Sequence, residues 1–251
     1  MSIWVLSDVH LAFGVPSKTM EVFGPAWKQY AEKIASNWKR LISQEDLILI
    51  PGDISWAMRL EEALIDLQWI DALPGTKVIL RGNHDYWWSS LEKMGKVIPP
   101  SIHCIHNNVY LWKEVAIAGS RLWDTPEYGF GAFTVIQDNP RERTKTLEEG
   151  AQAPQEDEKI FVRELERLRL SLSQIPKTAS RKIAMTHYPP IGADLSSSRA
   201  SSLLEEFQID TCVFGHLHNI RPGSLPFGKA RGVNYVFASC DYLNFIPVKL
   251  V

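Results

Sequence analysis

The chain has 251 residues, of which 45% are hydrophobic, which is ample for one α/β domain with a large core and short for two. Its net charge of -2 lacks the basic footprint of a dedicated nucleic-acid binder, so long duplex DNA is not favoured as a ligand. The three cysteines, Cys104, Cys212 and Cys240, lack Cys-x-x-Cys spacing, and we expect buried free thiols in a reducing compartment.

The N-terminal segment has no positively charged start, and its short apolar run ends at Asp8, which argues against a signal peptide. No apolar segment approaches the roughly 20 residues of a membrane-spanning helix. We therefore expect a cytoplasmic protein that does not bind a membrane.

Apolar patterning predicts alternating strands and helices in the first part of the chain. Short apolar runs predict strands at 3–6, 47–50 and 77–80. Apolar residues at three- or four-residue spacing predict one helix that starts at Gly24-Pro25 and a second that ends at Pro74-Gly75. This strand-helix-strand order favours parallel pairing with right-handed crossovers.

The remainder continues as one domain, residues 1–251, with a single long excursion. Extended runs predict strands at 102–105, 109–112, 115–118, 183–186 and 211–215, with closing strands at 234–239 and 245–251, and periodicity predicts a helix at 156–172. Residues 120–155 show no sustained period and are rich in Gly, Pro, aromatic and charged residues. Two interpretations stay open for them: a lid over the site, or a docked surface loop with solvated charges.

Metal-type ligands follow five of the predicted strands. They are Asp8 and His10, Asp53, Asn83 with His84 and Asp85, His187, and His216 with His218. Open α/β sheets place their chemistry at such carboxyl ends of strands. Asp8 and His10 are two residues apart, so in an extended segment both side chains can meet one ion.

Each motif alone also has an ordinary structural interpretation. The stretch from Arg81 to Asp85 resembles an Asx-type turn with a surface histidine, Asp53 is a candidate helix N-cap, and a lone histidine such as His187 is more often structural. The shared position of all five groups at strand ends favours a common metal site.

In this order, Asp-x-His, Gly-Asp, Gly-Asn-His-Asp, a lone His and Gly-His-x-His resemble the calcineurin-like metallophosphoesterase superfamily, and the resemblance runs from Asp8 to His218. It implies a four-layer α/β/β/α sandwich that holds two divalent ions. The implied ligands are Asp8, His10 and His218 for the first ion, Asn83, His187 and His216 for the second, and Asp53 as the bridge. Nitrogen and oxygen ligands without sulfur suit Mn²⁺, Fe or Zn, and we expect Mn²⁺.

The resemblance implies hydrolysis of a small phosphodiester or phosphomonoester by a metal-bound hydroxide. His84 would be the general acid, and adjacency suggests that Asp85 orients and charges its ring. Arg81 would contact either a phosphate oxygen or a structural ion-pair partner. The alternative is a non-catalytic metal-binding scaffold of the same fold, which is disfavoured because no ligand position and no acid is missing.

Departures from the family pattern narrow the substrate class. Serine/threonine protein phosphatases carry Gly-Asp-x-x-Asp-Arg-Gly and Gly-Asn-His-Glu, whereas this chain has Trp56 in the first motif and Asp85 in the second. Trp56 also occupies the position of the tyrosine ligand of purple acid phosphatases, and an indole N–H only donates. A small phosphate ester remains, including nucleotides. The aromatic residues near the motifs would either stack on a base or pack in the core: Phe13, Trp56, Tyr86, Trp87, Trp88 and Tyr188.

Overall fold

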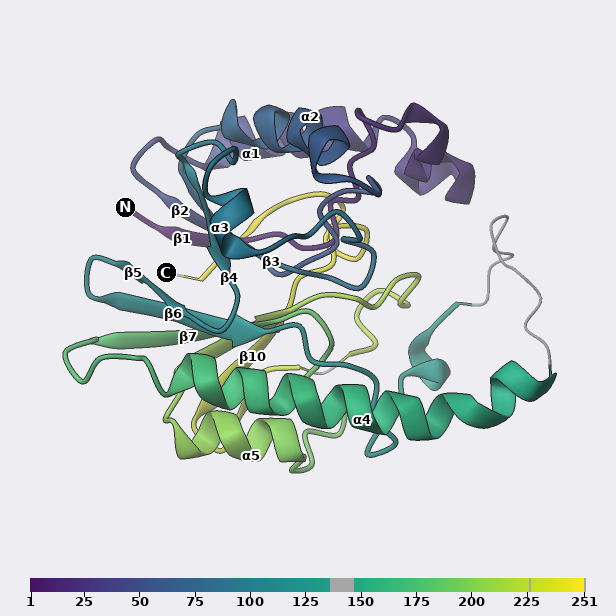
Figure 1. The fold of residues 1–251 in the computed structure, drawn as a ribbon, viewed down its shortest axis with the longest axis vertical. Helices are drawn as coiled ribbons and strands as arrows, with labels where there is room; N and C mark the ends of the chain where they lie inside the picture. Colours follow the sequence, from purple (N-terminus) through teal and green to yellow (C-terminus); the bar gives the residue numbers. More distant parts are fainter. Residues whose placement is uncertain (136–146, 226, 251) are drawn as a thin grey trace.

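The computed structural model describes residues 1–135, 147–225 and 227–250, without the side chains of 147–154. Two β-sheets pack face to face, and helices cover both outer faces (Figure 1). This arrangement confirms the expected four-layer α/β/β/α sandwich.

The first sheet has the strand order β11-β1-β2-β3-β4, in which β1 to β4 run parallel and β11 pairs antiparallel with β1. Its strands are β1 (Ile3–Val5), β2 (Leu47–Ile50), β3 (Thr76–Leu80), β4 (Ile102–Ile105) and β11 (Val248–Lys249). The helices of this half are α1 (Tyr30–Leu41), α2 (Leu60–Asp71) and α3 (Leu91–Met94), with 3-10 helices η1 (Pro16–Lys18), η2 (Met20–Phe23) and η3 (Pro25–Trp27).

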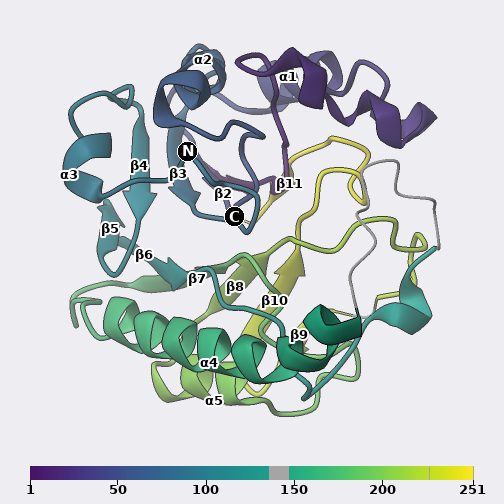
Figure 2. The same ribbon diagram turned by 45° about the vertical axis from the view of Figure 1, so that its right-hand side comes forward.

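The second sheet has the order β5-β6-β7-β8-β10-β9, with antiparallel strands at both edges and parallel strands between. Its strands are β5 (Val109–Trp112), β6 (Val115–Ser120), β7 (Arg181–Thr186), β8 (Thr211–Phe214), β9 (Lys229–Ala230) and β10 (Val233–Phe237). The helices of this half are α4 (Leu147–Leu172) and α5 (Arg199–Glu206), with η4 (Gly131–Phe133). Figure 2 shows the chain crossing from β10 in the lower sheet to β11 in the upper one.

The unbroken apolar sequence of β2 follows from burial on both of its faces. Leu47 and Leu49 contribute to the core between the two sheets, whereas Ile48 and Ile50 pack in the outer core beneath α1 and α2. Successive strand side chains point to opposite faces, so a strand covered on both sides needs apolar residues at every position. The predicted parallel pairing is confirmed for this strand on both sides.

Two helix boundaries differ from the prediction. The helix expected from Gly24-Pro25 is interrupted, because Gln29 takes a left-handed conformation with φ of 53°, so η3 ends at Trp27 and α1 begins at Tyr30. Helix α4, expected at 156–172, already begins at Leu147. No helix in the described ranges is long and apolar enough to cross a membrane.

The described part of the 120–155 excursion is docked against the second half of the molecule. The Tyr128 hydroxyl donates to the Pro189 carbonyl at 2.7 Å, and the Val135 amide donates to the Asn219 carbonyl at 2.7 Å. Residues 120–135 thus lie against the loops that follow β7 and β8, as a docked surface loop would. Residues 136–146, which include Arg141, Arg143 and Lys145, lie outside the described ranges.

The cysteines are free thiols, as the sequence predicts. Cys212 and Cys240 are buried, while Cys104 is half-buried on β4. Burial raises the pKa of the Cys212 thiol to about 12, which keeps it protonated and unreactive.

Candidate metal centre

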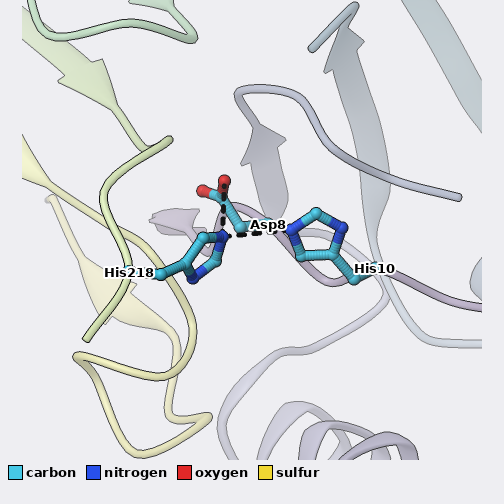
Figure 3. Close-up of side chains that lie close together, drawn as sticks. All are labelled: Asp8, His10 and His218. Carbon is cyan, nitrogen blue, oxygen red and sulfur yellow. Dashed lines mark hydrogen bonds and ion pairs between the residues drawn. The ribbon is translucent and has the colours of Figure 1, made fainter. Parts of the chain in front are cut away.

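The structure brings all seven expected ligand residues together where the carboxyl ends of both sheets meet. A first group consists of Asp8, His10 and His218, whose donor atoms all lie within 4.8 Å of one another (Figure 3). The Nε2 atoms of His10 and His218 are 3.1 Å apart, and His218 Nε2 is 3.6 Å from Asp8 Oδ1. Three donor atoms from the loops after β1 and β8 thus converge on one point.

A second group forms around the Asn83 side-chain oxygen. His187 Nε2 lies 2.6 Å from Asn83 Oδ1, and His216 Nδ1 lies 3.1 Å from the same oxygen. The other nitrogen of His187, Nδ1, is 3.0 Å from the Pro51 carbonyl, which fixes the ring and leaves Nε2 facing the group.

The Asp53 carboxylate lies between the two groups. Its Oδ2 is 3.6 Å from His10 Nε2, and its Oδ1 is 3.4 Å from His187 Nε2. One oxygen therefore faces each group, which is the arrangement that a bridging carboxylate requires. Asp53 Oδ1 also accepts the His84 backbone amide at 2.9 Å, which anchors the loop after β3 to the loop after β2.

The ligand loops adopt backbone conformations that non-glycine residues seldom take. Asp8, His10, Asp53 and His216 all have positive φ, from 45° to 72°. Such conformations cost roughly 1–3 kcal/mol each and persist where the surrounding structure over-determines them, commonly at functional sites. The packing is also close, because a Cβ atom at Gly215 would overlap the Asp8 carboxylate.

The carboxylates of Asp8 and Asp53 are buried. Among the described side chains, histidines are their only potentially cationic partners. Burial raises the pKa of Asp8 to about 6, although His218 opposes the shift. Burial, with Asp8 and Asp85 adding to it, raises the pKa of Asp53 well above its ordinary value. Two buried carboxylates that resist ionisation in isolation are stabilised when a divalent cation binds between them.

Three of the ligand histidines offer unprotonated nitrogens to such a cation. Burial first, and then the neighbouring histidines, lowers the pKa values of His10 and His187 well below the ordinary range and that of His216 to about 3. Neutral imidazoles with carboxylate and amide oxygens form a donor set that suits a first-row divalent metal. The residues present therefore fit the ions that the sequence resemblance implies.

The structure adds Asp241, which the sequence analysis missed. His218 Nδ1 is 3.0 Å from Asp241 Oδ1, and the Asn219 amide donates to Asp241 Oδ2 at 3.1 Å. Although burial opposes it, Asp241 raises the pKa of His218 to about 9. A carboxylate on Nδ1 fixes the tautomer that leaves Nε2 as the ligand atom. Asp241 stands in no recognisable motif, and only its place after a predicted strand could have signalled it.

The expected pairing of Asp85 with His84 is wrong. Asp85 Oδ1 accepts the amides of Ile54 and Ser55 and the Trp87 indole, and Oδ2 accepts the Gly82 amide at 2.7 Å. These four bonds join the loops after β2 and β3. His84 Nδ1 has no hydrogen-bond partner among the described residues, so Asp85 supports the loops and does not orient the ring.

The aromatic residues around the motifs mostly pack in the core. Trp87, Trp88 and Tyr188 are buried, whereas Phe13 and Tyr86 are exposed. Trp56 is half-buried and stacks on His10 with a centroid distance of 5.0 Å, and its ring also lies 4.4 Å from that of His84. Trp56 therefore packs against a ligand and the expected acid together.

Comparisons with known structures agree with the fold. The phosphopantetheinyl hydrolase PptH from Mycobacterium tuberculosis has a similar structure, with a TM-score of 0.56 at 15% identity over 100% of this chain and 95% of that one. The calcineurin-like phosphoesterase YfkN from Bacillus subtilis matches with a TM-score of 0.52 at 16% identity over 96% and 82% of the respective chains. At these identities the likeness shows the fold alone.

No curated protein sequence matches the chain significantly. The profile of the calcineurin-like phosphoesterases, however, matches residues 1–219, which include every candidate ligand. The chain therefore belongs to the calcineurin-like phosphoesterase family, and the possible metal site of Asp8, His10, Asp53, His187 and His218 supports a metallophosphoesterase.

Proposed function

We propose that the protein hydrolyses a small phosphate ester with two divalent ions held by the seven residues described above, and that both ions are Mn²⁺. The observation that carries this proposal is the position of Asp53, whose two carboxylate oxygens face separate groups of donor atoms. A pair of ions so held supplies Lewis-acid polarisation of the phosphoryl oxygens and an activated water.

The chain's own residues would then bind and orient the ester and supply a proton. His84 is half-buried, and its ring lies 5.7 Å from that of His10. We assign it the role of general acid toward the leaving alkoxide. Burial, followed by the charge of His218, lowers the pKa of His84 to about 4, so an anionic substrate must supply the charge that favours its protonated form.

A cavity on the Asp241 side of His218 supports a small substrate. It has a volume of about 270 Å³ and is lined by Trp27, Tyr242, Asn244 and Val135, with Asp241 at the side of His218. The Trp27 ring lies 5.8 Å from that of His218. Ligand sites of this kind commonly measure roughly 300–1,000 Å³, so this cavity suits the organic part of a small ester, such as a nucleoside.

The test is hydrolysis by the Mn²⁺-loaded protein across chromogenic mono- and diesters, cyclic nucleotides and nucleotide pyrophosphates. We expect turnover of at least one class, with loss of turnover after chelation and recovery on Mn²⁺ addition. A protein that binds Mn²⁺ and hydrolyses none of them would instead be a metal-binding scaffold with this fold.

A further inference from the structure

A second polar pocket lies beyond the ends of β3, β4 and β6, against α4. Its charged lining comprises Arg81, Arg121, Arg167 and Glu164, with His106 beside them. The cavity is small, with a volume of about 20 Å³. It shares no residue with the donor set of the metal centre.

Positive charge outweighs negative charge in this pocket. Glu164 is the acidic residue of the lining, its side chain is only 3% exposed, and it already bonds to Arg167 at 2.7 Å and to Arg121 at 3.3 Å. Arg163 also reaches Glu164, at 3.7 Å, but from outside the pocket. One carboxylate thus serves three guanidinium groups before Arg81 is counted.

The Arg81 side chain has no hydrogen bond and no ion pair with any residue in the described ranges. Its Nε is shielded from solvent and has no hydrogen-bond partner. Arg81 lies two residues before the candidate ligand Asn83. Of the two sequence-based interpretations, the structural ion pair is therefore not observed in that part of the chain. A shielded guanidinium N–H without an acceptor is costly unless a ligand supplies one.

Arg121 shows the same feature. Its Nε is also shielded and unpartnered, while its guanidinium stacks on the Trp123 ring with a distance of 4.4 Å to the centroid. The stacking holds the fork in one orientation. Burial first, and then the nearby Arg167, lowers the pKa of His106, which shows the positive field of the pocket acting on a neighbour.

We propose that this pocket binds a phosphate group through the forked N–H donors of Arg81 and Arg121. Guanidinium groups match tetrahedral oxyanions by paired hydrogen bonds, and the three lining arginines with one glutamate leave a net positive charge that a phosphate neutralises. The bound group is either a second phosphate of an ester whose first phosphate lies at the metal centre, or free inorganic phosphate.

The pocket adjoins two ligand loops. The Arg121 carbonyl accepts the backbone amides of His187 at 3.1 Å and Tyr188 at 2.9 Å, and Arg81 lies two residues before Asn83 in the same loop. A phosphate bound there sits on the same backbone segments that deliver two of the candidate ligands. Binding itself does not depend on the proposed hydrolysis, so it can be tested separately.

The first test labels arginines of the wild-type protein with phenylglyoxal and maps the labelled peptides by mass spectrometry, with and without inorganic phosphate and with and without Mn²⁺. We expect phosphate to slow labelling of Arg81 and Arg121 at least fivefold in both metal conditions, and to leave the exposed Arg40 unaffected. Protection that requires Mn²⁺, or no protection, would overturn the proposal, because the phosphate would then be at the metal centre or nowhere near the pocket.

The second test compares Arg81→Gln with Arg163→Gln. Both remove one arginine near Glu164, but the Arg163 side chain is 56% exposed and lies outside the pocket. If the pocket takes a second substrate phosphate, Arg81→Gln raises KM for a bisphosphorylated ester at least tenfold and KM for nitrophenyl phosphate less. If it takes free phosphate, the same variant instead raises the inhibition constant of inorganic phosphate at least tenfold.

Arg163→Gln should change none of these constants by more than about twofold. Equal behaviour of the two variants would overturn the proposal even if hydrolysis is confirmed. Conversely, phosphate protection of Arg81 in a protein without turnover would retain the pocket and remove only the proposed function. Thermal unfolding of both variants checks that neither result reflects loss of the fold.

Discussion

The candidate metal centre has a floor and a rim, which differ in burial and in their access to a substrate. The floor consists of Asp8, His10, Asp53 and His187, which are at most 1% exposed, and the rim consists of Asn83, His84, His216 and His218, which are half-buried. The floor residues are fixed by backbone contacts, such as the Pro51 carbonyl on His187. Because the floor residues are shielded from solvent, they can hold ions but have little access to a substrate. Residues that act on a substrate are therefore expected at the rim.

Substitution in the floor should have the largest effect. We expect Asp53→Asn to reduce bound Mn²⁺ at both positions and to lower turnover by more than the roughly 100-fold that an outer-shell partner costs, because one carboxylate faces both groups. Elemental analysis and steady-state kinetics measure this. Asp46→Asn, which alters a buried carboxylate at the opposite end of β2, is the control. Full two-ion content in Asp53→Asn would remove the bridging role.

Substitution at the rim should separate chemistry from metal binding. His84→Asn is expected to keep both ions and to lose about 10²–10⁴-fold in turnover of esters with poor leaving groups, the usual contribution of a general acid. The loss should shrink for a nitrophenyl ester, whose leaving group needs no proton. If good and poor leaving groups suffer equally, His84 positions the substrate and does not protonate it.

Asp241 connects the two regions, because it holds the rim ligand His218 by the nitrogen that faces away from Asp8. We expect Asp241→Asn to weaken Mn²⁺ binding roughly 10–100-fold while leaving the metal-free fold intact. Titration of the metal-free protein with Mn²⁺ gives the affinity. Asp194→Asn, at an exposed turn, should bind as the wild type does. Unchanged affinity in Asp241→Asn would mean that the His218 ring needs no such support.

The smallest effect concerns pH and the floor carboxylates. The pKa of Asp8 is raised from 3.8 to about 6 in the metal-free fold, so its protonated form stabilises that fold at low pH, and this contribution is lost as pH rises through 6. Bound Mn²⁺ requires the ionised form. Bound Mn²⁺ also requires His218, whose pKa is raised to about 9, to lose its proton. Mn²⁺ affinity should therefore rise with pH from 5 to 9, by about tenfold per pH unit for each proton that the ion displaces, and the gain in Tm on adding Mn²⁺ should rise with it. A gain that is constant from pH 5 to 8 would contradict this.

The ligand set was predictable because each member follows an apolar run that forms a buried strand. Leu47–Ile50 is followed by Asp53, and Thr211–Phe214 by His216 and His218, so the parallel topology carries them to one end. The pattern of strands and helices followed from the same periodicity. The packing of the two sheets brings the ligands together in space. The sequence motifs indicate this packing only through their resemblance to a known family.

Other parts of the site could not be predicted from neighbouring residues. Asp85 adjoins His84 in sequence, yet the turn sends its carboxylate toward Ile54 and Ser55. Asp241 belongs to the site only because β10 ends beside β8. Helix α5 was missed because its sequence is rich in serine, and it depends on the reciprocal cap between Ser198 and Ser201.

The position of Asp8 has a consequence for how the molecule unfolds. It follows β1 of the first sheet, but its carboxylate accepts the His216 amide at 3.0 Å and the Ser239 hydroxyl at 3.1 Å, both from the second half of the chain. An ion held by Asp8, His10 and His218 would therefore act as a cross-link between the halves, across the interface that joins the sheets. Neither half could open without releasing the ion, so metal loading would bind the two sheets into one cooperative unit and slow proteolysis of both.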